Sequence, residues 1–120
     1  MKRILPLLWL ALLLLSCEKE NLVPEDAWPQ WLRTTIEEHE RSIGNDPGSS
    51  CAVGAWKRTT WKRVYYYEYY NLFSSSMPIA ISHAGDTLET YVGDINSDYD
   101  REKCCGTWVW KGPDFIDFTD

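Results

Sequence analysis

The sequence is poor in the residue patterns on which many enzymes and metal sites depend. It has two histidines and four cysteines in 120 residues. No Gly-x-Ser-x-Gly pattern marks a nucleophilic serine, and no Cys-x-x-Cys pair marks thioredoxin-like redox chemistry. Because nothing selects one serine over another, the sequence predicts no catalytic residue, no cofactor and no enzymatic activity. A small enzyme is therefore the least favoured functional alternative.

Basic residues and long apolar runs are also scarce. Twelve Lys and Arg stand against eighteen Asp and Glu, which gives a formal net charge of −6. Phosphate backbones attract clustered Lys and Arg, so this balance argues against nucleic acid as a partner. The longest apolar run, residues 4–15, is shorter than the ~20 residues that a membrane-spanning helix requires.

The N-terminus has the organisation of a secretory signal peptide. Lys2 and Arg3 form a positive start, residues 4–15 form an apolar centre, and the small Ser16 precedes Cys17. An ordinary cleaved signal and an uncut anchor are the alternatives to a more specific interpretation of this cysteine.

Leu14-Leu15-Ser16-Cys17 resembles the lipobox of bacterial lipoprotein signal peptides. The resemblance implies that residues 1–16 are removed and that Cys17 carries a diacylglyceryl group on its thiol and an acyl group on its new amino terminus. Several acyl chains make such an attachment stable, whereas one chain holds a protein only marginally. The membrane is therefore expected to be a partner through the N-terminal lipid.

Glu18-Lys19-Glu20 follows the cysteine directly. This tripeptide is similar to the export signal of lipoproteins from the Bacteroidota, which implies the outer membrane and its surface as the destination. The same residues also suit a solvated tether. The chain as a whole resembles small single-domain lipoproteins of the Bacteroidota of unassigned function.

Removal of residues 1–16 leaves 104 residues, enough for one domain. We expect residues 17–25 to form the lipidated tether and residues 26–120 a single α+β domain. Six tryptophans and seven tyrosines in this part favour strands and bury large areas, and they are common at binding surfaces.

Three thiols remain if Cys17 is lipidated. Disulfides are permitted beyond the inner membrane, and we expect Cys51 to pair with Cys104 or Cys105. The closed loop of more than fifty residues would contribute roughly 4 kcal/mol in the chain-entropy model. A vicinal Cys104–Cys105 bridge is the alternative. Zinc is disfavoured because adjacent cysteines lack the usual spacing of ligands.

Apolar residues recur at helical spacing over residues 27–43, and Gly44 and Pro47 follow as stop signals. We expect Asp26 to cap this helix and Pro29 to occupy its first turn. The apolar stripe consists of Trp28, Trp31, Leu32, Thr35, Ile36 and Ile43.

Strand signals follow the helix. The strongest is the aromatic stretch 61–70, which lacks Gly and Pro. Weaker signals cover residues 55–59, 77–83, 87–92 and 107–111. An N-terminal amphipathic helix packed on an antiparallel sheet of three to five strands is the expected fold. Alternation places Trp108 and Trp110 on one face of the last strand, in the core.

A loop of acidic residues raises the question of calcium. Its oxygen side chains alternate as at the start of an EF-hand loop, at Asp94, Asn96, Asp98 and Asp100. Tyr99 replaces the glycine of the sixth position, and Cys105 replaces the bidentate glutamate of the twelfth. The sequence therefore favours a solvated acidic loop over a metal site.

The best candidate for function is an aromatic row on the stretch 61–70. Alternation places Tyr65, Tyr67 and Tyr69 on one face, and Trp61 flanks them. Such a row could anchor a protein or stack on sugar rings, or it could pack beneath the helix. We expect a non-enzymatic interaction or inhibitor module, with a protein partner ahead of a glycan because aromatics mixed with charges are typical of protein interfaces.

Overall fold

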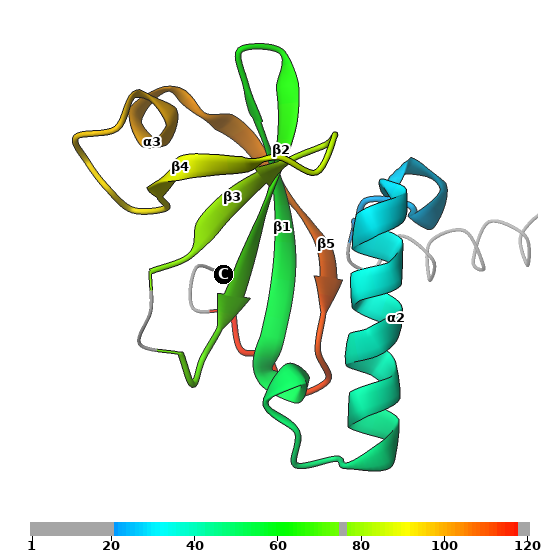
Figure 1. The fold of residues 1–120 in the computed structure, drawn as a ribbon. Helices are drawn as coiled ribbons and strands as arrows, with labels where there is room; N and C mark the ends of the chain where they lie inside the picture. The colour runs from blue at the N-terminus through cyan, green and yellow to red at the C-terminus, as the bar shows by residue number, and fades with distance from the viewer. Residues whose placement is uncertain (1–20, 75–76, 118–120) are drawn as a thin grey trace, which may run out of the picture.

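The computed structural model describes residues 21–74 and 77–117, which form one long helix beside a five-stranded antiparallel sheet (Figure 1). The chain is therefore an α+β domain. Cys17 and the tripeptide 18–20 lie outside the described residues. Within the described part, no helix is long and apolar enough to cross a membrane.

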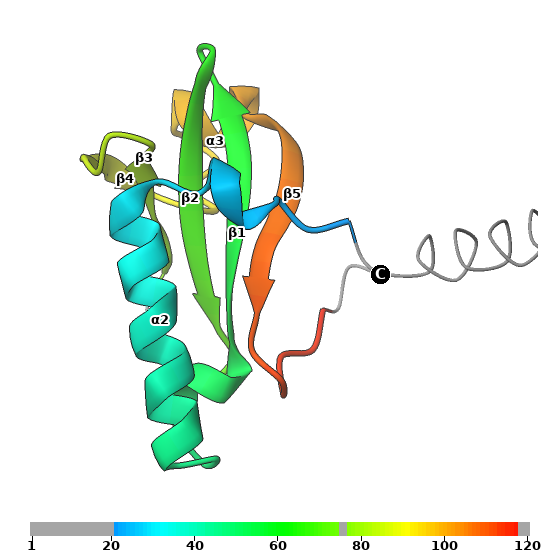
Figure 2. The ribbon, with the colours of Figure 1, turned by 90° about the vertical axis from the view of Figure 1, so that its right-hand side faces the viewer.

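The elements follow one another along the chain as η1 (Glu25–Ala27), α2 (Gln30–Asn45), η2 (Ser50–Val53), β1 (Gly54–Trp61), β2 (Val64–Asn71), β3 (Ile79–Ser82), β4 (Thr87–Tyr91), α3 (Asp98–Glu102) and β5 (Cys104–Lys111). The strand order in the sheet is β4-β3-β2-β1-β5, and every neighbouring pair is antiparallel. Figure 2 shows α2 on one side of the strands and the C-terminal segment on the other.

The helix begins later than the sequence predicts. Asp26 lies in η1, and Pro29 occupies the N-cap position of α2 in an extended conformation. A residue before proline avoids helical dihedrals, which explains why Trp28 is extended and the first turn starts only at Gln30. The helix also continues past Gly44 to Asn45.

The aromatic stretch 61–70 is not one strand, contrary to the prediction. Trp61 ends β1 and pairs with Val64, which begins β2. Lys62 and Arg63 form the two-residue turn between them, with φ of 50° and 62°. Hairpin turns of this left-handed kind usually carry Asn or Gly, so Lys-Arg gave no turn signal.

Hydrophobic side chains form a cluster on each face of the sheet. The cluster beneath α2 consists of Val23, Leu32, Ile36, Trp56, Tyr67, Val109 and Trp110. The opposite cluster lies beneath α3 and consists of Ala80, Val92 and Tyr99 with Trp61, Tyr66, Tyr70 and Leu88 packed against it. Val23 is 3% exposed, and its N–H donates to the Trp108 carbonyl at 2.9 Å. Packing therefore begins within the segment expected to be a tether.

A β-bulge separates the two tryptophans of β5. Trp110 pairs with Trp56, whereas Trp108 pairs with the next residue of β1, Lys57, so Val109 is an extra residue on β5. Trp110 joins the core beneath α2, and Trp108 contacts Tyr70 of the opposite face. The prediction that both tryptophans share a face is therefore wrong.

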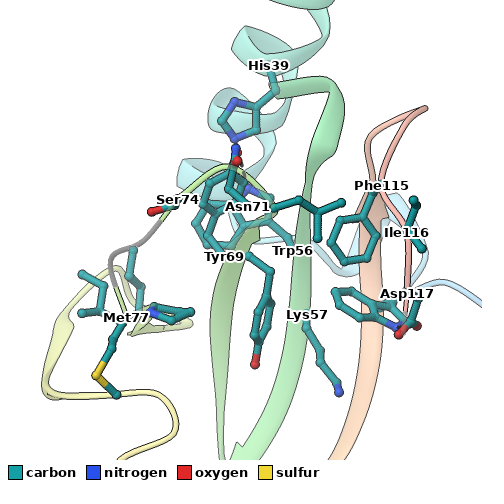
Figure 3. A pocket seen from close by; sticks show the side chains of 16 residues that line it. His39, Trp56, Lys57, Tyr69, Asn71, Ser74, Met77, Phe115, Ile116 and Asp117 are labelled. Carbon is teal, nitrogen blue, oxygen red and sulfur yellow. Dashed lines mark hydrogen bonds between the residues drawn. The ribbon is translucent and has the colours of Figure 1, made fainter. Parts of the chain in front are cut away.

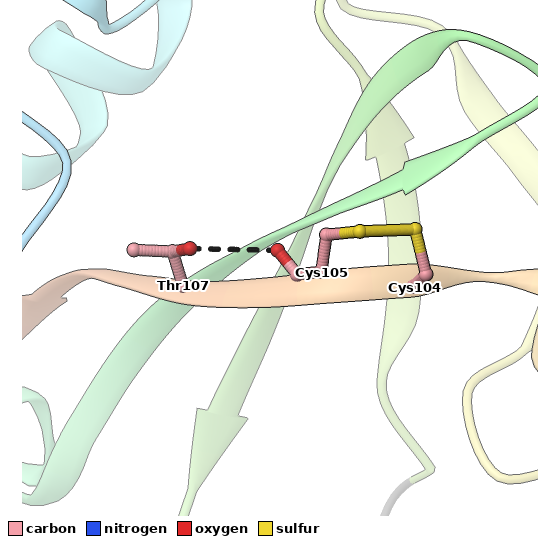
Figure 4. The surroundings of a disulfide bond; sticks show 3 residues. All are labelled: Cys104, Cys105 and Thr107. Carbon is pink, nitrogen blue, oxygen red and sulfur yellow. Dashed lines mark hydrogen bonds between the residues drawn. A yellow bond between two sulfur atoms is a disulfide. The ribbon is translucent and has the colours of Figure 1, made fainter.

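The disulfide joins Cys104 to Cys105, and Cys51 is free (Figure 4). Cys51 lies just before β1, while Cys104 pairs with Thr60 near the other end of that strand. The strand alone separates these ends by about 20 Å at ~3.3 Å per residue. That distance exceeds the reach of a disulfide, so the expected Cys51 bridge is wrong and the vicinal alternative is present.

Candidate functional site

A cleft of about 730 Å³ opens where β3 diverges from β2. The pairing of these strands stops at Glu68 and Ala80, but β2 continues to Asn71. Figure 3 shows His39 at one end of the cleft, Phe115 and Ile116 along one side, and Met77 on the other. The apolar lining comes from Trp56, Tyr69, Tyr70, Leu72, Met77, Pro78, Ile79, Ile81, Trp108, Phe115 and Ile116.

Large apolar side chains are also exposed around the cleft, and we call them the apolar rim. They are Leu72, Met77, Ile79 and Ile116, which line the cleft, and Phe73, which follows Leu72 in the chain. Phe73 and Ile116 are 74% and 57% exposed. Large apolar side chains that stay exposed together on a small domain typically mark a binding site.

His39 is held at the cleft in one tautomer. The indole N–H of Trp56 donates to its Nε2 at 3.2 Å, which leaves the proton of a neutral imidazole on Nδ1. Nδ1 faces the sulfur of Cys51 at 3.5 Å. Burial lowers the pKa of His39, although nearby Glu38 opposes this effect. The neutral ring is therefore favoured.

This Cys51–His39 pair lacks the arrangement of an activated nucleophile. A thiol is activated by an imidazole nitrogen that can accept its proton. Here the nitrogen facing the sulfur already carries a proton, and the other nitrogen is occupied by Trp56. The pair was not predicted, because the two residues meet only through the packing of α2 against η2.

Asn71 is engaged within the protein at the same end of the cleft. Its amide nitrogen donates to the Ser50 carbonyl at 2.9 Å and to the Tyr69 hydroxyl at 3.0 Å. Its side-chain oxygen accepts from the Phe73 N–H at 2.9 Å. These bonds fix the end of β2 and leave little hydrogen-bonding capacity for a ligand.

The other end of the cleft is organised around Trp108. Its indole N–H donates to Asp117 at 2.7 Å, and Asp117 pairs with Lys111 at 3.5 Å. The ammonium groups of Lys57 and Lys111 lie over its ring at 5.2 and 5.1 Å. In residues 21–74 and 77–117, no carboxylate forms an ion pair with Lys57.

Beside the cleft lies a buried carboxylate. Glu68 is 0% exposed and accepts hydrogen bonds from the Tyr99 and Tyr70 hydroxyls at 2.5 and 2.6 Å. The Lys103 ammonium pairs with it at 2.9 Å. Burial, followed by the bonds to Glu68, raises the pKa of both tyrosines, so both phenols remain protonated.

The four residues of the predicted aromatic row do not form one exposed surface. Tyr67 is 0% exposed, packs edge-on against Trp31 and shares a hydrogen bond of 2.9 Å with His83. Tyr65 is exposed, and Trp61 lies on the opposite face of the sheet.

The physical reason is the position of α2, which covers the face that alternation assigns to Tyr65, Tyr67 and Tyr69. Of the row, only Tyr69 reaches the cleft.

The carboxylates of the acidic loop bond to other groups of the loop and of the short helix α3. Asp100 accepts from the Gly93 N–H at 2.9 Å, and this bond, assisted by Lys103, lowers its pKa. Asp94 accepts from the Asn96 N–H, and Asp98 pairs with Arg101. Among the described residues, no group of three or more His, Cys, Asp or Glu side chains is placed to hold a metal ion.

The stability of the domain should fall as the pH falls below the usual pKa of histidine. The pKa of His39 is lowered from 6.5 in the folded protein, so the unfolded chain binds this proton more readily. Its contribution is therefore complete above pH 6.5 and is lost as the pH falls through the folded pKa. Urea unfolding at about pH 7.5 and about pH 5.5 measures this loss.

His39→Gln should reduce this pH dependence, because the amide cannot titrate but can still accept from Trp56. Thr34→Gln is the control, because it changes an exposed residue of the same helix that does not titrate, and it should keep the dependence of the unmodified chain. An equal decrease in all three proteins would show that groups other than His39 dominate.

Comparisons with protein families, curated proteins and solved structures give no match to this chain.

Proposed function

We propose that the chain is a lipid-anchored protein of the cell envelope that binds a protein partner and catalyses no reaction. The cleft, with the apolar rim around it, is the observation that carries this proposal. Apolar patches that stay exposed on a small domain are typical of surfaces that other proteins cover.

The polar groups of the cleft support binding over catalysis. Both ring nitrogens of His39 are engaged, so the imidazole that lines the cleft offers no nitrogen as a general base. A glycan, the runner-up ligand, would require several free donors and acceptors. The Asn71 amide and the Trp108 indole already bond within the protein, which favours an apolar polypeptide surface.

The lipobox pattern at Cys17 supports the anchor, and the tripeptide 18–20 supports the outer membrane and its surface as the location. Replacing Cys17 with alanine should release the protein from the membrane fraction of the cells that express it. Retention of the variant in that fraction would show that another segment holds the chain.

Affinity capture tests the partner. The mature chain, residues 17–120, is immobilised through its N-terminus and exposed to solubilised envelope proteins and, separately, to soluble glycans. We expect saturable capture of one protein. The double variant Phe73→Ser/Ile116→Ser should lose it, because both changes remove apolar area from the rim.

Ile95→Ser is the matched control, since Ile95 is 77% exposed but does not line the cleft. We call the Phe73→Ser/Ile116→Ser protein the rim variant. Equal capture by the rim variant and by the Ile95→Ser control would show that the partner does not bind at the cleft. Saturable retention of a glycan with no protein would favour the runner-up.

A further inference from the structure

Lys57 is held in place at the cleft by its neighbours. It projects from β1 on the face opposite α2, and its side chain is half-buried. A Cβ atom on Gly106 would lie 2.6 Å from the Lys57 Cε, so the glycine makes room for the lysine stem. The ammonium then lies 5.2 Å from the centre of the Trp108 ring. Lys57 is therefore confined between Gly106 and Trp108.

This ammonium differs from the other charged groups near the cleft. Lys111 pairs with Asp117, and Lys103 pairs with Glu68 and Asp100. Within the part of the chain that the structure describes, Lys57 has no carboxylate in ion-pair contact. An ammonium that is held over an aromatic ring and has no counter-ion can pair with an anion of a bound ligand, which would complete this site.

We infer that the cleft binds an apolar polypeptide segment whose acidic side chain pairs with Lys57. This inference rests on the proposed function and names the chemistry of the partner. Charge complementarity requires one carboxylate on the segment, and the apolar lining requires hydrophobic neighbours beside it. The Trp108 ring supports the pair by lowering the freedom of the ammonium.

The apolar rim favours a polypeptide over a fatty acid. A fatty acid would fill the cleft and leave Phe73, which lies outside the lining, exposed to water. An extended segment advances about 3.3 Å per residue and can cover both the cleft and the rim. A polypeptide ligand therefore explains why the apolar rim is exposed in the unbound protein, whereas a fatty acid does not.

A charge-reversal selection tests the inference. A displayed library of random twelve-residue peptides is selected against the mature chain, against Lys57→Glu and against Lys62→Glu. Lys62 is the matched control, because it is an exposed cation at the β1–β2 turn, away from the cleft. We expect the unmodified chain and the control to enrich apolar peptides with Asp or Glu, and Lys57→Glu to enrich Lys or Arg instead.

A synthetic peptide from the selection then gives the affinity through tryptophan fluorescence. Replacing its acid with the amide should weaken binding about tenfold or more to the unmodified chain. The same replacement in the peptide should change its affinity for Lys57→Gln only slightly. Lys57→Gln is included because a neutral substitution disturbs the fold less than the charge reversal does. Unfolding midpoints establish that each variant is folded.

The inference is overturned if no peptides are enriched, or if the enriched peptides show no acidic preference that depends on Lys57. Saturable binding of dodecanoate without any enriched peptide would assign the cleft to a lipid. If Lys57→Glu and Lys57→Gln both still capture the envelope protein that the rim variant loses, the proposed function stands and this inference fails.

Discussion

Replacing Lys103 with methionine is expected to destabilise the domain by about 3–5 kcal/mol, because the change leaves a buried charge without its counter-ion. The Lys103 ammonium lies 2.9 Å from the carboxylate of Glu68, whose side chain is 1% exposed. Tyr70 and Tyr99 still donate to Glu68 in the variant, but their phenols are neutral and cannot replace a cation. Urea unfolding of the variant beside the unmodified chain measures the loss.

Two further variants isolate the cause. Lys62→Met removes an exposed cation of the turn and should change the free energy of unfolding by less than about 0.5 kcal/mol. The double variant Glu68→Leu/Lys103→Met removes both charges and should be more stable than Lys103→Met alone. A Lys103→Met variant within about 1 kcal/mol of the unmodified chain would mean that the tyrosines alone stabilise Glu68.

Tyr67→Ala is expected to cost about 3–5 kcal/mol, whereas Tyr65→Ala should cost less than about 1 kcal/mol. Tyr67 is 0% exposed and packs against Trp31 at a centroid distance of 5.7 Å. Tyr65, two residues away on the same strand, is 43% exposed beneath the guanidinium of Arg58. The two tyrosines thus share a strand and a face but differ in burial.

Tyr67→Phe separates packing from hydrogen bonding. It keeps the ring and removes the hydroxyl, which shares a hydrogen bond with His83 and also interacts with Arg58, so a cost of about 1 kcal/mol is expected. Similar losses for Tyr65→Ala and Tyr67→Ala in urea unfolding would contradict the placement of α2 over Tyr67. Tyr67→Ala is also a poor test of binding, since unfolding would abolish any affinity.

Local periodicity was enough to predict the helix and most of the strands. Leu32 and Ile36 recur at helical spacing, and both are buried against the sheet. The alternation of Tyr65, Tyr67 and Tyr69 correctly assigned them to one face. Both patterns depend only on near neighbours in the chain, which a single sequence displays directly.

Features that depend on partner strands were not predictable in the same way. The turn at Lys62 and Arg63 has no glycine or asparagine, and the bulge at Val109 is set by its pairing with β1. Contacts between segments that are distant in the sequence also determine which face of the sheet α2 covers. The position of α2 buries Tyr67 in the core, and alternation along one strand does not indicate which face is buried.

The cleft was missed because its walls come from distant parts of the sequence. Tyr69 was predicted as a binding residue, but Trp108 was assigned to the core and Lys57 received no role. The pairing of β1 with β2 and of β1 with β5 brings these three residues into the lining of one cleft. No pattern within one segment of the sequence indicates which distant residues line the same cleft, so a structure is needed to identify them.

The bridge between Cys104 and Cys105 spans one peptide bond and ties no distant segments together. It therefore lacks the large chain-entropy contribution of a bridge that closes a long loop. Non-covalent packing alone holds β5 against β1 and α2 against the sheet. Residues 21–117 should consequently acquire the same native fold in a reducing cytoplasm and in an oxidising envelope.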